Sequence, residues 1–135
     1  MKIILTSILV DDQDKAVKFY TETPGFIKKT EIPMGEAKWL TVVSPENSND
    51  VELFLEPDWN TQIQIDGKPA AKVYKKILFD AGIPYTSFGI DDIQKDYERL
   101  EKIGVRFTIK PTKMAPVTIA VFDDTCGNLI QIAQK

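Results

Sequence analysis

The sequence contains no histidine among its 135 residues. This absence excludes Ser-His-Asp and Cys-His catalysis within the chain, because both mechanisms use an imidazole as the proton acceptor. It also removes the commonest side-chain ligand of zinc, nickel and ferrous iron. Any reaction or metal site in this chain would have to be built from other residues.

Cysteine is almost as scarce, since Cys126 is the only one. A single cysteine rules out an internal disulfide and fits a reducing, cytoplasmic location. Without a histidine to activate it, Cys126 is interpreted as a turn residue rather than a nucleophile.

The chain also lacks a concentrated basic region and a long apolar run. Its net charge is −3 with scattered Lys and Arg residues, which argues against nucleic acid as the main partner. The apolar start ends at Asp11 and Asp12 without a small-residue cleavage site, so it predicts a buried strand rather than a signal peptide. No other stretch is long enough to predict a membrane span.

What the sequence does contain is an internal repeat. Strand-like residues end at an Asp pair in each copy, and a helical pattern and a glycine follow. The matching residues lie 80 positions apart: Val10, Asp11, Asp12 and Lys15 recur as Ile90, Asp91, Asp92 and Lys95. The second Asp of each pair is expected to cap the following helix, an interpretation preferred to an acidic cation site. An offset of 79 continues the match to the end of each copy, where Glu52 falls on Gln131.

Each copy is therefore read as strand, helix, strand, strand, strand. We expect an α+β fold with two tandem βαβββ modules, residues 1–57 and 83–135, in one domain. The modules are expected to form one curved mixed β-sheet around a concave cleft. Residues 58–82 are the linker, a polar loop followed by a helix from about Pro69 to Asp80 that ends before Gly82.

The chain resembles the vicinal oxygen chelate superfamily, which includes glyoxalase I, extradiol dioxygenases and bleomycin-resistance proteins. "VDDQDKAVKFYTETPGF" is similar to the opening motif of that family, and "DDTCGNLIQI" is similar to its last strand. Thr125 and Cys126 stand where the family usually has Pro and Asp. The resemblance covers nearly the whole chain, and one fold of this kind carries many functions.

Metal-dependent members of the family place one ligand on each of four strands. The resemblance carries these places to Leu5, Glu52, Tyr85 and Gln131. Only Glu52 is a normal metal ligand, whereas a tight transition-metal site needs three or four N, S or carboxylate donors. We therefore expect no metal and no other cofactor.

Strand alternation predicts which side chains face the cleft. The expected ligand-binding residues are Leu5, Ser7, Trp39, Glu52, Phe54, Glu56, Tyr85, Ser87 and Gln131. Apolar walls with a few polar groups are typical of a small-molecule pocket. Glu52 fits equally well as a solvated carboxylate lining an open cleft.

The leading hypothesis is a metal-free protein, similar to bleomycin-resistance proteins, that binds a small cationic or aromatic molecule. The alternative is a divalent-metal-dependent lyase, similar to lactoylglutathione lyase, or a dioxygenase, with Glu52 as catalytic base or ligand. A purely structural protein ranks third. Family resemblance also implies a homodimer. The loop with Trp59, Asn60 and Gly67 is expected to act as a flap over the cleft.

Overall fold

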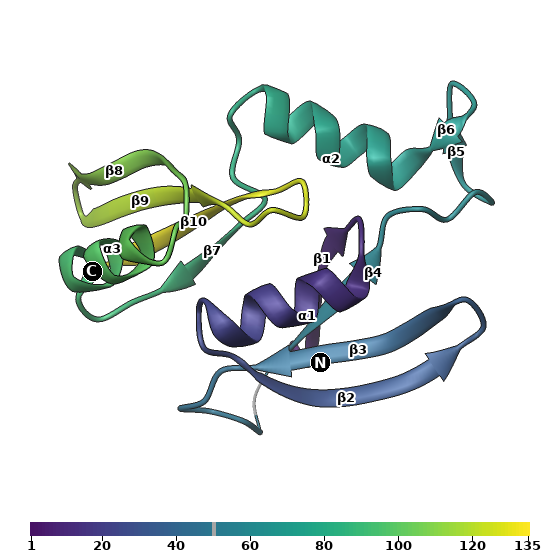
Figure 1. Cartoon of the computed structure of the whole chain (residues 1–135), viewed down its shortest axis with the longest axis horizontal. Coiled ribbons are helices and arrows are strands. Elements are labelled where there is room, and N and C mark those ends of the chain that lie inside the picture. Colours follow the sequence, from purple (N-terminus) through teal and green to yellow (C-terminus); the bar gives the residue numbers. More distant parts are fainter. Residues whose placement is uncertain (50) are drawn as a thin grey trace. The chain divides into compact units, whose positions relative to one another are not determined.

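The computed structural model describes residues 1–49 and 51–135. The chain divides into two compact units, residues 1–74 and 75–135, which we call unit 1 and unit 2. The boundary falls inside a helix, so each unit is described by itself. Figure 1 shows the elements of both units in sequence colours.

Unit 1 contains the first βαβββ module and the start of the linker. Its main elements are β1 (Leu5–Val10), α1 (Gln13–Glu22), β2 (Ile27–Met34), β3 (Ala37–Val43) and β4 (Glu52–Pro57). The strands form a sheet of order β1-β4-β3-β2, in which β1 and β4 are parallel and the other pairs are antiparallel. Helix α1 packs against β3 and β4 (Figure 1).

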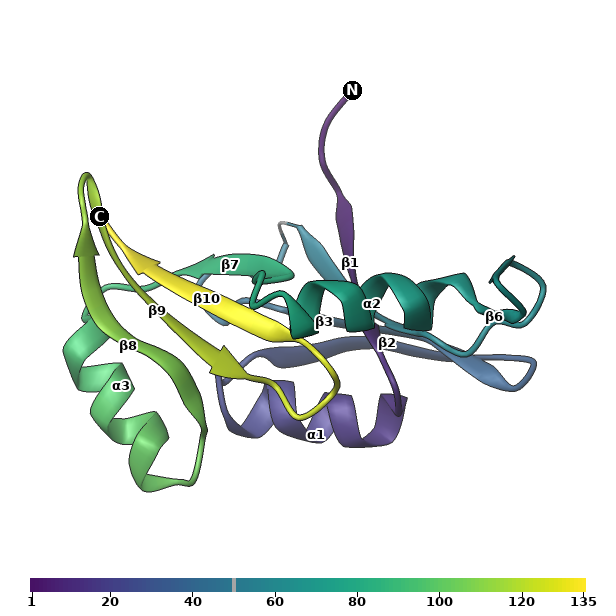
Figure 2. The same ribbon diagram turned by 90° about the horizontal axis from the view of Figure 1, so that it is seen from above.

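Unit 2 repeats this arrangement. Its elements are β7 (Thr86–Gly89), α3 (Ile93–Lys102), β8 (Phe107–Met114), β9 (Val117–Asp123) and β10 (Leu129–Gln134). The sheet order is β7-β10-β9-β8, again with one parallel pair, β7 and β10. Figure 2 shows α3 lying along β8.

The prediction of an α+β fold with two βαβββ modules is confirmed. One detail differs, because the module strands pair as two four-stranded mixed sheets where we expected one curved sheet. The four strands of each module hydrogen-bond with one another in the same order in both units. The repeat in the sequence predicted the succession of helix and strands along each module, but it carries no signal for how the strands pair.

The Asp pairs cap the helices as predicted. The Asp12 side chain accepts a hydrogen bond from the backbone N–H of Lys15 at 3.0 Å, and Asp92 accepts one from Lys95 at 3.1 Å. Each bond satisfies a backbone donor that the first helical turn leaves open. The preceding Asp11 makes an exposed ion pair with Lys15 at 2.8 Å.

The linker holds a short hairpin and a helix. Strands β5 (Gln64–Ile65) and β6 (Lys68–Pro69) turn through Asp66 and Gly67, both with positive φ. Helix α2 (Ala70–Asp80) follows and agrees with the predicted range. None of the described helices has both the length and the apolar character needed to span a membrane.

The cores of the two units are apolar and contain strand residues together with one face of each helix. In unit 1, Ile8, Val10, Leu40, Leu55 and the helical Tyr20 are all fully buried. In unit 2, Val121, Phe122 and Ile130 lie in the same kind of environment. Burial of a large apolar side chain contributes about 1.5–3 kcal/mol, so these residues stabilise the sheet of each unit, including the unit 1 sheet that carries the candidate cavity.

A candidate ligand-binding cavity

Unit 1 contains a cavity of about 980 Å³ over the carboxyl end of β4. Its wall includes Leu9 from β1, Trp39 from β3, and Phe54 and Glu56 from β4. These side chains meet because alternate residues of a strand share one face and the register aligns them across the sheet. Leu9 lies beside Glu56 in the β1–β4 pair, and Ser7 lies beside Phe54.

The wall is aromatic at its centre. The rings of Trp39 and Phe54 have centroids 4.5 Å apart and planes inclined by 31°. Such a tilted pair presents a broad apolar surface on which a flat ligand can stack. Residues 59–63, which include Trp59, form another part of the lining.

The charge of the lining has one sign. Glu36 and Glu56 contribute carboxyl groups, and none of the described lining residues is Lys or Arg. A carboxylate beside an aromatic face favours a cationic ligand, since both groups attract positive charge. The same arrangement disfavours an anionic ligand.

The segment that carries Trp59 is anchored at both ends. Asp58, which is 2% exposed, donates its backbone N–H to the Val10 carbonyl at 2.9 Å and pairs with the Lys72 ammonium at 3.0 Å. At the other end, the Ala70 N–H donates to the Ile63 carbonyl at 2.9 Å. These bonds connect β4 to the start of α2 and fix where the lining segment begins and ends.

Glu52 lies on the same strand as Phe54 and Glu56 but is not part of the cavity lining. The buried Thr41 hydroxyl donates to its Oε1 at 2.6 Å, and its strand neighbour is Leu5. The structure therefore places Leu5 beside Glu52 in neighbouring strands, and strand alternation had assigned both side chains to one face of the sheet. Their surroundings offer a hydroxyl and an apolar side chain rather than further charged donors.

The remaining predicted site residues lie in unit 2. Gln131 donates through Nε2 to the Ser87 hydroxyl at 3.1 Å, and the two residues are direct neighbours in the β7–β10 register. Tyr85 precedes β7, and its backbone N–H donates to the Leu129 carbonyl at 2.8 Å. The 80-residue offset of the repeat matches Tyr85 with Leu5 and so predicts Tyr85 beside Gln131. In the structure Ser87 lies beside Gln131, because the strand register differs by two residues between the units. Ser87 also lines a smaller cavity of about 500 Å³.

The four family positions do not fit a transition-metal site. Leu5 has no donor atom, the Gln131 amide is neutral, and Tyr85 offers a phenol, so Glu52 is the one carboxylate among them. No group of three or more Cys, Asp and Glu side chains is suitably placed within residues 1–49 and 51–135.

Some of the lining was missed by strand alternation alone. Met34 and Glu36 flank Gly35 in the β2–β3 turn, and both line the cavity. The sequence signal for these two residues was the tight turn itself, since a hairpin returns the chain next to Trp39.

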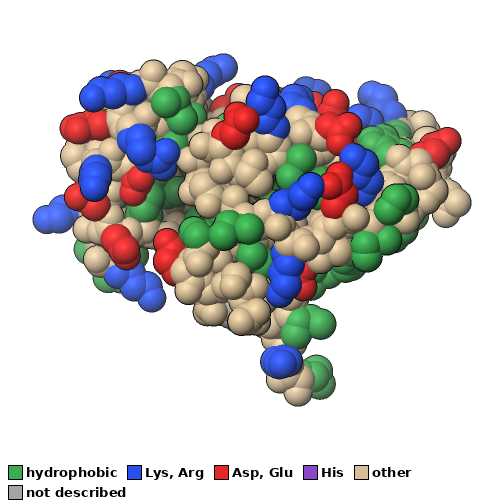
Figure 3. All heavy atoms as spheres, turned by 60° about the horizontal axis from the view of Figure 1, so that its bottom comes forward, with side chains coloured by type: hydrophobic (Ala, Val, Ile, Leu, Met, Phe, Trp, Pro, Cys, Tyr) green, Lys and Arg blue, Asp and Glu red, His purple; other side chains and the backbone are tan. Residues whose placement is uncertain are grey.

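Figure 3 shows one face of the molecule, on which basic and acidic side chains are interspersed rather than gathered by sign.

Comparisons with known proteins identify the family. The model of the Glyoxalase/Bleomycin resistance protein/Dioxygenase superfamily matches residues 2–132. The chain is 58% identical to the uncharacterized protein YurT of Bacillus subtilis (strain 168), with 100% of both chains covered. It is 25% identical to a probable lactoylglutathione lyase of Synechocystis sp. (strain ATCC 27184 / PCC 6803 / Kazusa), over 99% of this chain and 95% of that protein.

Solved structures give the same result. The crystal structure of UcmS2 matches with a TM-score of 0.81 and 29% identity, covering 98% of this chain and 97% of that one. TnmS3, an antibiotic binding protein from Streptomyces sp. CB03234, matches with a TM-score of 0.74 and 27% identity, covering 99% and 95%. The chain belongs to the Glyoxalase/Bleomycin resistance protein/Dioxygenase superfamily.

Proposed function

We propose that this protein binds a small, flat, aromatic cation in the unit 1 cavity and does so without a metal. The observation that carries the proposal is the Trp39–Phe54 pair beside Glu56, in a lining with no basic residue among those described. Stacking supplies most of the affinity, and the carboxylate selects positive charge. Protein cavities of this size commonly hold small molecules.

The family supports this class of function. TnmS3, with a similar fold, is an antibiotic binding protein, and binding without turnover is consistent with the residues available here. We further propose that the protein works as a cytoplasmic homodimer, since a single cysteine permits no internal disulfide and family resemblance implies pairing.

The surroundings of Glu52, within the part of the chain that the structure describes, support binding over catalysis. Its Oε1 accepts from Thr41 at 2.6 Å, and no histidine exists in the chain to stabilise a developing negative charge. Proton abstraction beside a carbonyl needs an electrophile of that kind. Glu52 is therefore assigned a structural role, holding Thr41 and the β3–β4 pair.

Intrinsic fluorescence tests the proposal directly, because Trp39 and Trp59 are the only tryptophans and both line the cavity. Titration with proflavine, a flat three-ring cation, is expected to quench this emission saturably. Trp39→Ala should weaken binding more than tenfold through lost stacking. Glu56→Gln should weaken it about fivefold, corresponding to about 1 kcal/mol for a partly solvated charge contact.

The control for charge is Glu46→Gln, which removes the same charge from an exposed loop of unit 1. It should leave proflavine affinity within twofold of wild type. Equal binding of proflavine and an anionic dye, 1-anilinonaphthalene-8-sulfonate, by wild type would contradict the charge selection.

The second candidate function is a metal-dependent lyase or dioxygenase with Glu52 as base or ligand. It is favoured by the similarity to the probable lactoylglutathione lyase of Synechocystis. Calorimetric titration of untagged protein with nickel, zinc, manganese and ferrous iron separates the two candidates. Saturable micromolar binding at one metal per chain, lost in Glu52→Gln, would establish the second candidate; the proposal predicts no such binding.

A further inference from the structure

The pairing of β3 with β4 stops short of the cavity. Among the described residues, the β3–β4 register pairs Thr41 with Phe54 and Val42 with Leu53, although both strands continue towards the cavity. If the ladder continued in the same antiparallel register for three more residue pairs, Lys38 would lie opposite Pro57. Proline has no backbone N–H, and the Lys38 carbonyl could not be satisfied there.

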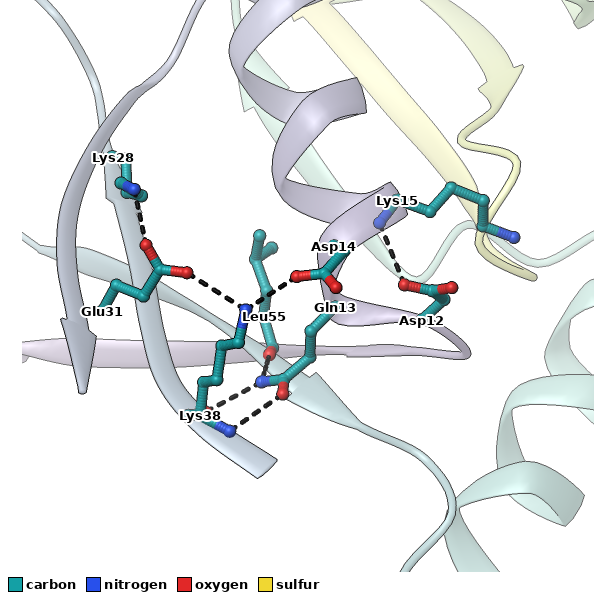
Figure 4. Close-up of polar contacts among 8 residues, drawn as sticks. All are labelled: Asp12, Gln13, Asp14, Lys15, Lys28, Glu31, Lys38 and Leu55. Atoms are coloured by element: carbon teal, nitrogen blue, oxygen red, sulfur yellow. Dashed lines mark hydrogen bonds and ion pairs between the residues drawn. The ribbon is translucent and has the colours of Figure 1, made fainter. Parts of the chain in front are cut away.

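The side chain of Gln13 occupies this gap. Its Nε2 donates to the Lys38 carbonyl and to the Leu55 carbonyl, both at 2.8 Å, and its Oε1 accepts from the Lys38 N–H at 3.0 Å. Figure 4 shows the carboxamide between the backbones of the two strands. Gln13 is 9% exposed, so its amide replaces the missing peptide partner in a buried position.

The side chain of Lys38 strengthens this end of β3. Its ammonium lies between Asp14 at 2.7 Å and Glu31 at 3.2 Å, as Figure 4 shows. Asp14 follows Gln13 on α1, and Glu31 belongs to β2. The start of α1 therefore holds Lys38 through both its backbone and its side chain.

Unit 2 has no such device at the corresponding place. The residue 80 positions after Gln13 is Ile93, which is also the first residue of its helix and is buried. There β9 and β10 pair without interruption from Asp123 with Leu129 to Thr118 with Gln134. The short ladder of unit 1 is therefore not a requirement of the βαβββ module.

The bonded backbone groups adjoin the residues that form the cavity wall. Trp39 follows Lys38 and Glu56 follows Leu55, and both line the cavity. We propose that Gln13 is a positioning residue that holds the ends of β3 and β4 apart and so sets the spacing between the Trp39 ring and the Glu56 carboxylate. This spacing selects the length of the flat cation, and the inference rests on the proposed function of the cavity.

Two measurements on Gln13→Ala and Gln13→Met test the inference. Amide hydrogen exchange at Lys38 should accelerate at least tenfold, because the acceptor of its N–H is removed, while exchange at Val42 inside the paired ladder should not change. The ratio of affinities for three-ring proflavine over one-ring phenyltrimethylammonium should fall at least fivefold. A loss of stability alone would lower both affinities and leave their ratio unchanged.

Gln94→Ala is the matched control, since it removes a glutamine from the exposed first turn of α3 in unit 2. It should leave both readouts at wild-type values. Two results would overturn the inference and leave the proposed function standing. One is unchanged amide exchange at Lys38 in the Gln13 variants. The other is faster exchange at Lys38 with an unchanged ratio of the two affinities. Wild type that binds neither probe would overturn both the proposed function and the selectivity assigned to Gln13.

Discussion

The two units have the same strand order but use it differently. Unit 2 pairs β9 with β10 over their whole length and closes them with a tight turn at residues 124–128. Unit 1 pairs β3 with β4 over a short stretch, inserts Gln13 beyond it, and has the larger cavity, about 980 Å³ against about 500 Å³. A duplicated module can thus keep its topology in both copies while the copies differ in the length of one strand pairing and in the size of the cavity described in each.

The turn of unit 2 gives the largest expected effect on stability. Asp124 is fully buried and accepts from the N–H groups of Cys126 and Asn128 at 2.7 and 3.0 Å and from the Asn128 amide at 2.9 Å. Asp124→Ala removes the shared acceptor of these three buried hydrogen bonds, so we expect a loss of about 3–4 kcal/mol in unfolding free energy. Denaturant unfolding measures it.

The matched change in unit 1 is Glu46→Ala in the exposed loop between β3 and β4. It should alter the unfolding free energy by less than about 0.5 kcal/mol. An equal loss of unfolding free energy in Asp124→Ala and Glu46→Ala would show that the Asp124 hydrogen bonds do not stabilise the turn of unit 2.

Gly127 is expected to give the next largest effect. Its φ is +91°, and a Cβ built there would lie 2.7 Å from Cε of the buried Lys75, whose ammonium donates to the Cys126 carbonyl at 2.5 Å. Gly127→Ala combines backbone strain with displacement of that ammonium, so we expect a loss of about 2–3 kcal/mol.

Gly35→Ala in the β2–β3 turn of unit 1 separates the two causes. Gly35 has φ +62° with open space around its Cβ position, so strain alone should cost about 1 kcal/mol. Thermal melts of both variants check the difference. A loss for Gly35→Ala that equals the loss for Gly127→Ala would show that Lys75 does not restrict the turn.

The smallest expected effect concerns acid stability and unit 1. Hydrogen bonds from Lys28 and then Lys38 lower the pKa of Glu31 below its ordinary value of 4.5. A lowered folded-state pKa gives stability that is present above pH 4.5 and lost as pH falls through the folded pKa. Glu31→Gln should therefore lower the melting temperature slightly at pH 7 and not at pH 2, with the difference reduced by salt.

Unit 2 has the opposite dependence, at alkaline pH. The hydrogen bond from the Tyr97 hydroxyl to Glu101 raises the pKa of Tyr97 above 10.0, with a smaller contribution from burial. Stability from this bond is present below pH 10 and is lost as pH rises through the folded pKa. Tyr97→Phe should be less stable than wild type at pH 8 and should approach it above pH 11. A constant difference across this range would refute the assignment.

The sequence predicted the features that depend on local pattern. The Asp caps, the succession of one strand, a helix and three strands along each module, and the range of α2 follow from spacing and turn chemistry, because these features depend on residues close in the chain. Strand parity also brought Trp39, Phe54 and Glu56 to one face, where the structure has the cavity.

Features that depend on distant pairing could not be predicted. Gln13 bonds to Lys38 and Leu55, 25 and 42 positions away, and nothing in its helix signals that contact. The register of Gln131 with Ser87 rather than Tyr85 was also hidden, since the repeat fixes the order of strands but not their alignment. Two sheets replaced the single expected sheet for the same reason.

The most direct test of the central claim, that the unit 1 cavity is the ligand site, is chemical-shift mapping of ¹⁵N-labelled protein during proflavine titration. We expect both indole N–H signals, Trp39 and Trp59, to shift together with backbone amides of residues 36–39, 54–56 and 59–63. Saturable shifts confined instead to residues 87–91 and 133–135, which line the unit 2 cavity, would contradict it.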